Sequence, residues 1–129
     1  MSEAVSGTRI IDVEAVAVPV RDQDRALCFY VDKLGFEVRR DVPMAEGGRW
    51  IQVAPRAATT TIALVAAGDG TPVGLETGIT FTTSDAAADH ADLLARGVPV
   101  DELLRWPGVP PMFAFYDEDG NGLKIIETA

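Results

Sequence analysis

The stretch that decides the fold is Phe115-Tyr-Asp-Glu-Asp-Gly-Asn-Gly-Leu-Lys-Ile-Ile-Glu127. Its Asp-Gly and Asn-Gly pairs at residues 119–122 are residue types that tolerate positive φ, as tight hairpin turns require. The side chains of residues 123–126 then alternate between the two faces of a strand, so Lys124 shares a face with Ile126. The stretch therefore predicts two strands joined by a tight turn, with a lysine on one face of the sheet.

Composition indicates a single globular domain. The chain has 129 residues, of which 47% are hydrophobic, which is enough to build one core. Its 20 Asp and Glu against 11 Lys and Arg give a net charge of −9, which repels phosphate backbones and anionic lipid. We therefore expect neither a nucleic-acid partner nor a membrane partner.

Cysteine usage and the N-terminal residues favour the cytoplasm. Cys28 is the single cysteine, so no internal disulfide can form, as is usual in a reducing compartment. Residues 1–9 lack the apolar core of a signal peptide, and no apolar run approaches the roughly 20 residues of a membrane span. We expect a cytoplasmic protein and assign Cys28 to a helix as a buried, unreactive thiol.

The order of predicted elements repeats. Asp22 and Asp85 are good N-caps for two helices, which Gly35 and Gly97 are placed to end. The predicted strands cover residues 10–20, 36–42, 49–54 and 60–66 in the first half, and 77–83, 98–104, 111–116 and 123–127 in the second. Each half therefore reads strand–helix–strand–strand–strand, which suggests an internal duplication.

The domain organisation follows from this repeat. Residues 1–9 have no periodicity and are expected to form a flexible N-terminal tail. We expect one domain over residues 10–127, with a first module at about 10–67, a linker at about 68–76 and a second module at about 77–127.

Four motifs then carry a resemblance to a known family. They are Val18-Pro-Val-Arg-Asp22, Phe29-Tyr30, Leu34-Gly35-Phe36 and Asp117-Glu-Asp-Gly-Asn121. Together they resemble the vicinal oxygen chelate superfamily of glyoxalases, bleomycin-resistance proteins and extradiol dioxygenases, although Glu118 replaces a proline that the family usually has there. The resemblance implies an α+β fold in which two βαβββ modules form a curved mixed sheet with a cleft, which in many members holds a divalent metal ion.

The residues at the family's metal-ligand positions argue against such a metal. The resemblance places these positions at Ala15, Ala63, Gly78 and Lys124. Alanine and glycine have no donor side chain, and lysine is a cation. His90 is the only histidine, so one chain cannot supply a pair of histidine ligands. We expect no metal and no other cofactor, and therefore neither a metal-dependent glyoxalase nor a ring-cleaving dioxygenase.

The same alignment predicts which side chains line the cleft. Neighbours on the same strand face as those four positions, together with a proline-rich loop before residue 111, supply aromatic, hydroxyl and cationic groups. The predicted ligand-binding residues are Trp50, Gln52, Thr61, Thr80, Thr82, Arg105, Trp106, Met112 and Lys124. Trp50 can also be read as a core residue, and Lys124 as a side chain that reaches solvent or pairs with a nearby carboxylate.

The resemblance implies a metal-free binding protein of the bleomycin-resistance type, which sequesters a small organic ligand and works as a homodimer. The alternative is a metal-independent isomerase, lyase or cyclase acting on a small carbonyl compound, with Lys124 as the catalytic electrophile or base. A third possibility is an accessory protein without ligand chemistry. The sequence leaves open whether the protein is an enzyme.

Overall fold

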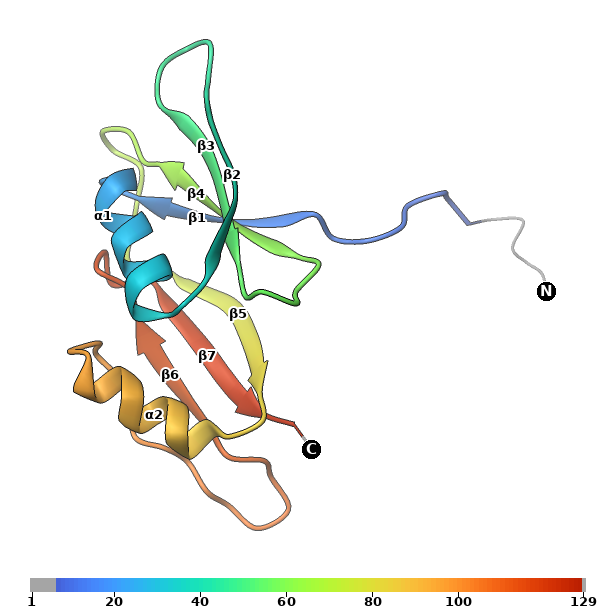
Figure 1. Cartoon of the computed structure of the whole chain (residues 1–129), viewed down its shortest axis with the longest axis vertical. Coiled ribbons are helices and arrows are strands. Elements are labelled where there is room, and N and C mark those ends of the chain that lie inside the picture. Colours follow the sequence, from blue (N-terminus) through green and yellow to red (C-terminus); the bar gives the residue numbers. More distant parts are fainter. Residues whose placement is uncertain (1–6, 129) are drawn as a thin grey trace.

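The computed structural model describes residues 7–128, so most of the expected N-terminal tail lies outside the described residues. Two mixed sheets lie one beyond the other, and each packs a helical segment on one face (Figure 1). The first sheet has the order β1-β4-β3-β2, with strands β1 (Ala15–Val20), β2 (Glu37–Pro43), β3 (Arg49–Ala54) and β4 (Thr61–Ala66). The second has the order β5-β7-β6, with strands β5 (Glu76–Thr83), β6 (Met112–Tyr116) and β7 (Gly122–Glu127).

The strands of the two sheets pair in the same pattern. In each, the first and last strands in chain order are parallel neighbours: β1 pairs with β4, and β5 pairs with β7. The remaining pairs are antiparallel, which makes both sheets mixed. The predicted α+β fold with curved mixed sheets is confirmed.

Strand β1 is shorter than predicted. It begins at Ala15, whose partner is Thr61, the first residue of β4. Residues 10–14 belong to no strand, although the carbonyls of Val13 and Glu14 accept hydrogen bonds from Thr60 and Thr61. The prediction of a strand from residue 10 is therefore wrong. The predicted alternation within the strand holds, because Val18 and Val20 are buried in the core whereas Ala17 is exposed.

The first helical segment changes character along its length. Helix α1 (Gln23–Leu27) begins at Asp22, whose carboxylate accepts a hydrogen bond from the Arg25 amide at 3.1 Å. The chain continues as the π-helical segment η1 (Cys28–Lys33), and Gly35 at φ 79° ends it. Cys28 lies on the exposed side of this segment, so the prediction of a buried thiol is wrong.

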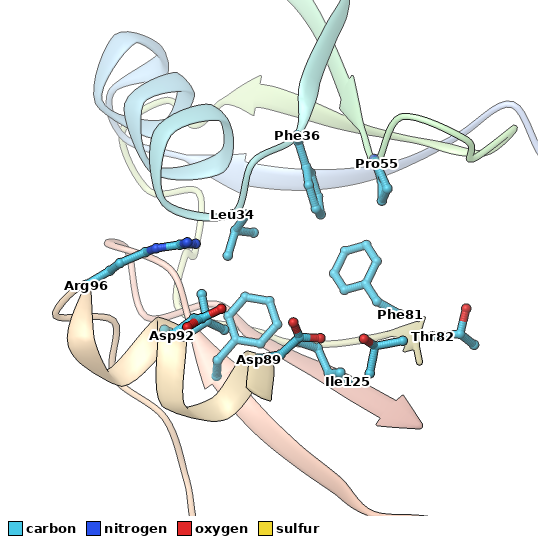
Figure 2. A pocket seen from close by; sticks show the side chains of 12 residues that line it. Leu34, Phe36, Pro55, Phe81, Thr82, Asp89, Asp92, Arg96 and Ile125 are labelled. Carbon is cyan, nitrogen blue, oxygen red and sulfur yellow. The ribbon is translucent and has the colours of Figure 1, made fainter. Parts of the chain in front are cut away.

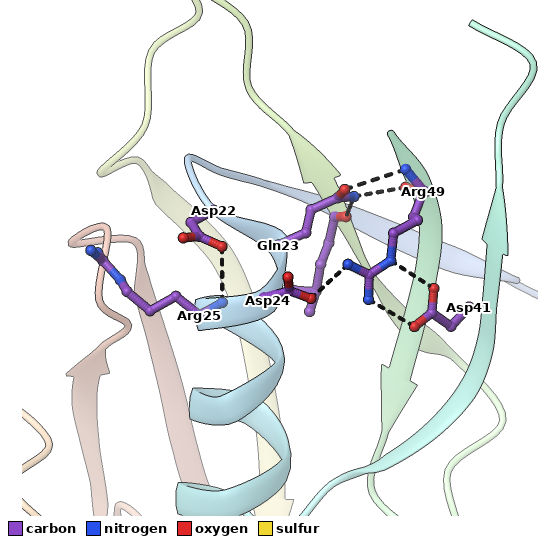
Figure 3. A network of polar contacts seen from close by, with 7 residues as sticks. Asp22, Gln23, Asp24, Arg25, Asp41 and Arg49 are labelled. Atoms are coloured by element: carbon purple, nitrogen blue, oxygen red, sulfur yellow. Dashed lines mark hydrogen bonds and ion pairs between the residues drawn. The ribbon is translucent and has the colours of Figure 1, made fainter. Parts of the chain in front are cut away.

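A cluster of polar contacts centred on Arg49 joins the start of α1 to the β2–β3 hairpin (Figure 3). The Arg49 guanidinium contacts Asp24 at 2.6 Å and Asp41 at 2.9 Å. The hydrogen bonds from Arg49 lower the pKa of the Asp41 carboxyl below its usual range. Behind this exposed cluster, the Gln23 amide donates to the carbonyls of Arg49 and Leu64 at 2.7 and 2.9 Å. The cluster therefore fixes β3 relative to the helix.

The second half has one strand fewer than predicted. Residues 98–104 make only two isolated bridges, Val100 with Phe115 and Leu104 with Met112. Four residues separate the two positions on one side and three on the other, so the register slips by one residue and no continuous ladder forms. Pro99 also lacks the amide hydrogen that a ladder would use. The prediction of a strand at 98–104 is therefore wrong, whereas helix α2 (Ala86–Ala95) follows its Asp85 cap as predicted.

The turn at residues 117–121 connects the two halves of the chain through hydrogen bonds. Asn121 is completely buried and uses both ends of its amide. Its oxygen accepts from the amides of Gly74 and Leu75, both at 2.9 Å, and its nitrogen donates to the Pro19 carbonyl at 2.9 Å and to Asp117 at 3.0 Å. The turn thus contacts the chain before β5 and the end of β1, and every polar group of Asn121 is satisfied.

Candidate functional site

The open face of the first sheet carries one group of predicted site residues. Alternation along the strands turns Val18, Ile51 and Leu64 toward the core and leaves the other set of side chains on the opposite face. Ala17, Ala63, Gln52 and Arg40 form one cross-strand row on this open face. In this row, small side chains on β1 and β4 therefore lie beside the larger polar side chains of Gln52 on β3 and Arg40 on β2.

Gln52 is the centre of a hydrogen-bond network on this face. The Trp50 indole Nε1 donates to Gln52 Oε1 at 2.9 Å. Gln52 Nε2 donates to Thr61 Oγ1 at 2.7 Å and to the Glu14 carboxylate at 3.1 Å. Gln52 and Thr61 are buried, with 3% and 4% of their surface exposed, whereas Trp50 is half-buried. The structure brings three predicted residues together and adds Glu14, which sequence reasoning missed.

The second sheet carries the other group on its own open face. Lys124 on β7 lies between Thr80 on β5 and Ala114 on β6 in the strand register. Met112 and Thr82 flank Ile126 in the next row. Lys124, Thr80 and Thr82 are exposed, and Leu123 and Ile125 point to the core side. Within residues 7–128, no carboxylate lies within ion-pair distance of Lys124.

An acidic and phenolic group borders this second face. Glu76 pairs with Gly122 in register, and its carboxylate lies over the glycine, 2.8 Å from where a Cβ would stand. Tyr116, the partner of Gly122 on the other side, donates its hydroxyl to Asp101 at 2.8 Å. The hydrogen bond to Asp101 raises the pKa of the Tyr116 phenol. The sequence pattern did not single out Glu76, Asp101 or Tyr116.

The predicted rim residues Arg105 and Trp106 lie in the loop that leads to β6. Both are exposed, and 59% of the Trp106 surface is accessible. The Leu104–Met112 bridge closes the loop at its base, with 2.8 Å and 3.2 Å backbone hydrogen bonds. An exposed indole at a loop tip next to the second face is available for contact with a ligand or another chain.

The residues at the family's metal positions fall into two pairs. Ala15 and Ala63 belong to the first sheet, and Gly78 and Lys124 belong to the second. None of these side chains can coordinate a divalent cation in the usual way, so the site does not fit the metal. Among residues 7–128, no three His, Cys, Asp or Glu side chains gather where they could hold a metal ion.

A hollow of about 730 Å³ lies between the first sheet and β5, within the size range of small-molecule sites. Of the predicted ligand-binding residues, Thr80 and Thr82 line it. Its other lining residues are Val13, Val16, Pro55, Ala57, Ala58, Thr60, Ile62, Thr77, Gly78, Ile79 and Phe81. Most of these were missed because they are unremarkable apolar residues in sequence, and only the packing of the two halves places them around one space.

Comparison with known proteins gives consistent matches. Residues 13–125 match the sequence family described as Glyoxalase/Bleomycin resistance protein/Dioxygenase superfamily. The chain is 32% identical to the uncharacterized protein YetH of Bacillus subtilis (strain 168), over 92% of this chain and 99% of that protein. Within residues 7–128, no helix is long and apolar enough to cross a membrane.

Solved structures resemble the chain along nearly its whole length. TnmS3, an antibiotic binding protein from Streptomyces sp. CB03234, is 38% identical with a TM-score of 0.85, covering 95% of this chain and 100% of its own. A protein of the same superfamily from Sphaerobacter thermophilus DSM 20745 is 33% identical with a TM-score of 0.87, covering 94% of this chain and 100% of its own.

Proposed function

Because this chain belongs to the Glyoxalase/Bleomycin resistance protein/Dioxygenase superfamily, we propose that it binds and sequesters a small organic molecule without a metal ion. The similarity to an antibiotic binding protein at 38% identity favours a binding role. The side chains at Ala15, Ala63, Gly78 and Lys124 favour a metal-free one, because they offer no ligand set for a divalent ion.

The observation that carries this proposal is the fixed aromatic surface on the first sheet. Trp50 is half-buried, and its N–H is held by Gln52, so the indole is oriented before any ligand arrives. Side chains held in place by such contacts lose less conformational freedom on binding. We propose that Trp50 forms one wall of the binding site, with the buried side chains of Gln52 and Thr61 behind it.

We propose that Thr80, Thr82, Met112, Lys124, Arg105 and Trp106 form the opposing wall, supplied by a second copy of the chain. The two groups occupy open faces of separate sheets, and both faces leave polar and aromatic side chains accessible. A symmetric homodimer would pair the first face of one copy with the second face of the other, twice. Light scattering on the purified protein should give twice the mass of the monomer; a monomer that still binds ligand would contradict the paired arrangement.

The experiment that tests the function is a fluorescence titration against a panel of antibiotics and metabolites. The Trp106→Phe variant isolates Trp50 emission, and the Trp50→Phe variant isolates Trp106 emission. We expect one panel compound to quench Trp50 saturably, with the same affinity before and after treatment with EDTA. If EDTA abolishes the binding, or if replacing both tryptophans leaves the affinity unchanged, the proposed metal-free site is wrong.

A second candidate function rests on Lys124. Its ammonium lies on an exposed sheet face beside Thr80, with no carboxylate in ion-pair range among residues 7–128. An unpaired cation there is able to stabilise an enolate oxygen of a small carbonyl compound. This arrangement favours a metal-independent isomerase, lyase or cyclase as the alternative to simple binding.

A further inference from the structure

A smaller hollow of about 180 Å³ lies between the two halves of the chain, on the helix side of the second sheet (Figure 2). Its floor consists of the buried side chains Leu93, Phe115 and Ile125. Ile125 and Phe115 point away from the open face that carries Lys124 and Ala114, because neighbouring residues on a strand alternate. The floor of the hollow therefore faces away from Lys124, and Thr82, at the end of β5, is the one residue that the hollow shares with the proposed second wall. The hollow also shares Pro55, Phe81 and Thr82 with the larger hollow.

Aromatic rings form the walls of this hollow. Phe36, which immediately precedes β2, meets Phe81 of β5 edge-on, with ring centroids 5.3 Å apart. Phe81 in turn stacks near Phe115 at 6.3 Å. Phe36 and Phe81 are only half-buried, so parts of both rings remain open to the hollow. Exposed ring faces present negative electrostatic potential, which attracts cations.

Two carboxylates stand at the rim. Asp89 and Asp92 lie one turn apart on α2, and both line the hollow. Figure 2 shows Asp89 on the side of Phe81 and Arg96 at the other end, beside Leu34. The Arg96 guanidinium donates to the Lys33 carbonyl at 2.8 Å. Among residues 7–128, neither carboxylate lies within ion-pair distance of a basic group.

We infer that this hollow binds a small organic cation, an ammonium group carried on one aromatic or branched apolar group. The apolar part would fill the space above Leu93, Phe115 and Ile125, and the ammonium would lie between the open rings and Asp89. The size fits, because an apolar cavity of about 150 Å³ accommodates a benzene ring. The lining carries two carboxylates, Asp89 and Asp92, against the single guanidinium of Arg96, which donates to the Lys33 carbonyl at the other end of the hollow. The net negative charge disfavours a carboxylate-bearing ligand of the same shape.

The test is a titration of the full chain with benzyltrimethylammonium, followed by NMR chemical shifts, with benzyl alcohol and benzoate as comparison probes. We expect saturable shifts of residues around Phe81 and an affinity about tenfold or more above that of benzyl alcohol, with no binding of benzoate. Phe36→Leu should weaken binding of the cation more than binding of the alcohol, because it removes a ring but keeps an apolar side chain.

The carboxylates provide the sharper control. The double variant Asp89→Asn/Asp92→Asn should lose the preference for the cation over benzyl alcohol, whereas Asp69→Asn, an exposed carboxylate elsewhere, should retain it. Equal affinities for the cation and the alcohol in the natural chain would overturn the inference, as would an undiminished preference in the double variant. Lys124→Met and Trp50→Phe should leave cation binding unchanged. If either abolishes it, the cation binds at the open faces and not in this hollow.

Discussion

The indole Nε1 of Trp50 donates a 2.9 Å hydrogen bond to Oε1 of Gln52, two residues further along the same strand. The indole N–H therefore points along β3 toward Gln52, the next side chain on the same face. Both protons of the Gln52 amide are also used, by Thr61 and Glu14. Gln52 has no donor left for a ligand, and a ligand of this face would meet the rings of Trp50 and not its N–H.

We predict that Gln52→Leu destabilises the protein by about 1–3 kcal/mol, because the half-buried Trp50 N–H loses its acceptor and the Glu14 carboxylate loses a donor, while the Thr61 hydroxyl keeps only its bond to the Glu14 carbonyl. Urea unfolding measures the cost, and Trp50 emission in a Trp106→Phe background reports the freed indole. The control is Thr60→Ala, whose hydroxyl bonds to the Val13 carbonyl and not to this network. Unchanged emission in Gln52→Leu would show that Gln52 does not orient the indole.

Lys124→Met tests the cationic group of the second face. Because Lys124 is exposed, we expect little change in stability, within about 0.5 kcal/mol. The affinity for an anionic compound found in the titration should fall about tenfold, and any carbonyl turnover should disappear. Lys33→Met is the matched control, since Lys33 is the only other lysine in the chain. A Lys124→Met variant with full affinity and full turnover would remove Lys124 from both candidate functions.

Much of the fold was accessible from local sequence signals. Strand β3 has its predicted bounds, because paired glycines precede it and Trp50 to Val53 alternate between faces. The errors at residues 10–14 and 98–104 both concern pairing, because residues 10–14 belong to no ladder and residues 98–104 lie beside β6 out of register. Whether an extended segment becomes a strand depends on the partner beside it, and that partner is set by pairing across the sheet and not by the segment's own residues.

Less of the candidate site than of the fold could be predicted from the sequence. Alternation placed Trp50 with Gln52, and Thr80 with Lys124, on shared faces. Glu14 could not be foreseen, because its carboxylate reaches Gln52 only through the parallel pairing of β1 with β4, across 38 residues of chain. The aromatic hollow likewise depends on Phe36 and Phe81 meeting from different halves. Contacts between distant segments are what a single sequence does not reveal.

Tyr30 predicts a dependence of stability on alkaline pH. The phenol is completely buried and donates to Asp117 at 2.9 Å, and burial together with that carboxylate raises its pKa far above 10. A raised folded-state pKa gives a contribution that is fully present below the unfolded value of about 10 and is lost as the pH rises above it.

We therefore expect the natural chain to lose about 1.4 kcal/mol of stability per pH unit above pH 10 through this one group. Tyr30→Phe should be less stable at neutral pH but should show a shallower loss above pH 10, measured by urea unfolding from pH 8 to 11. Tyr116→Phe, which removes an accessible phenol, should keep most of the natural slope. Equal slopes for Tyr30→Phe and the natural chain would contradict this origin.

Two glycines before β5 allow steric contact to be separated from backbone strain. Gly70 and Gly74 both have positive φ, at 82° and 75°. A Cβ on Gly70 would meet nothing within 4 Å, whereas one on Gly74 would lie 3.2 Å from the Asp119 carbonyl oxygen. Gly70→Ala should cost about 1–2 kcal/mol from strain alone. Gly74→Ala should cost more, because the hairpin turn must also move. Equal losses in the free energy of unfolding for the two variants, measured with urea, would show that the hairpin turn moves away from the new Cβ without a loss of stability.

The buried Asn121 has a consequence for the independence of the two halves of the chain. One half supplies this side chain, while the carbonyl of Pro19 in the other half and the amides of Gly74 and Leu75 complete its hydrogen bonds. The second half expressed alone would expose the Asn121 amide to water. The first half alone would leave the Pro19 carbonyl without its protein hydrogen-bond donor. The two halves therefore share one hydrogen-bond network, and we expect neither half to keep this turn when it is separated from the other.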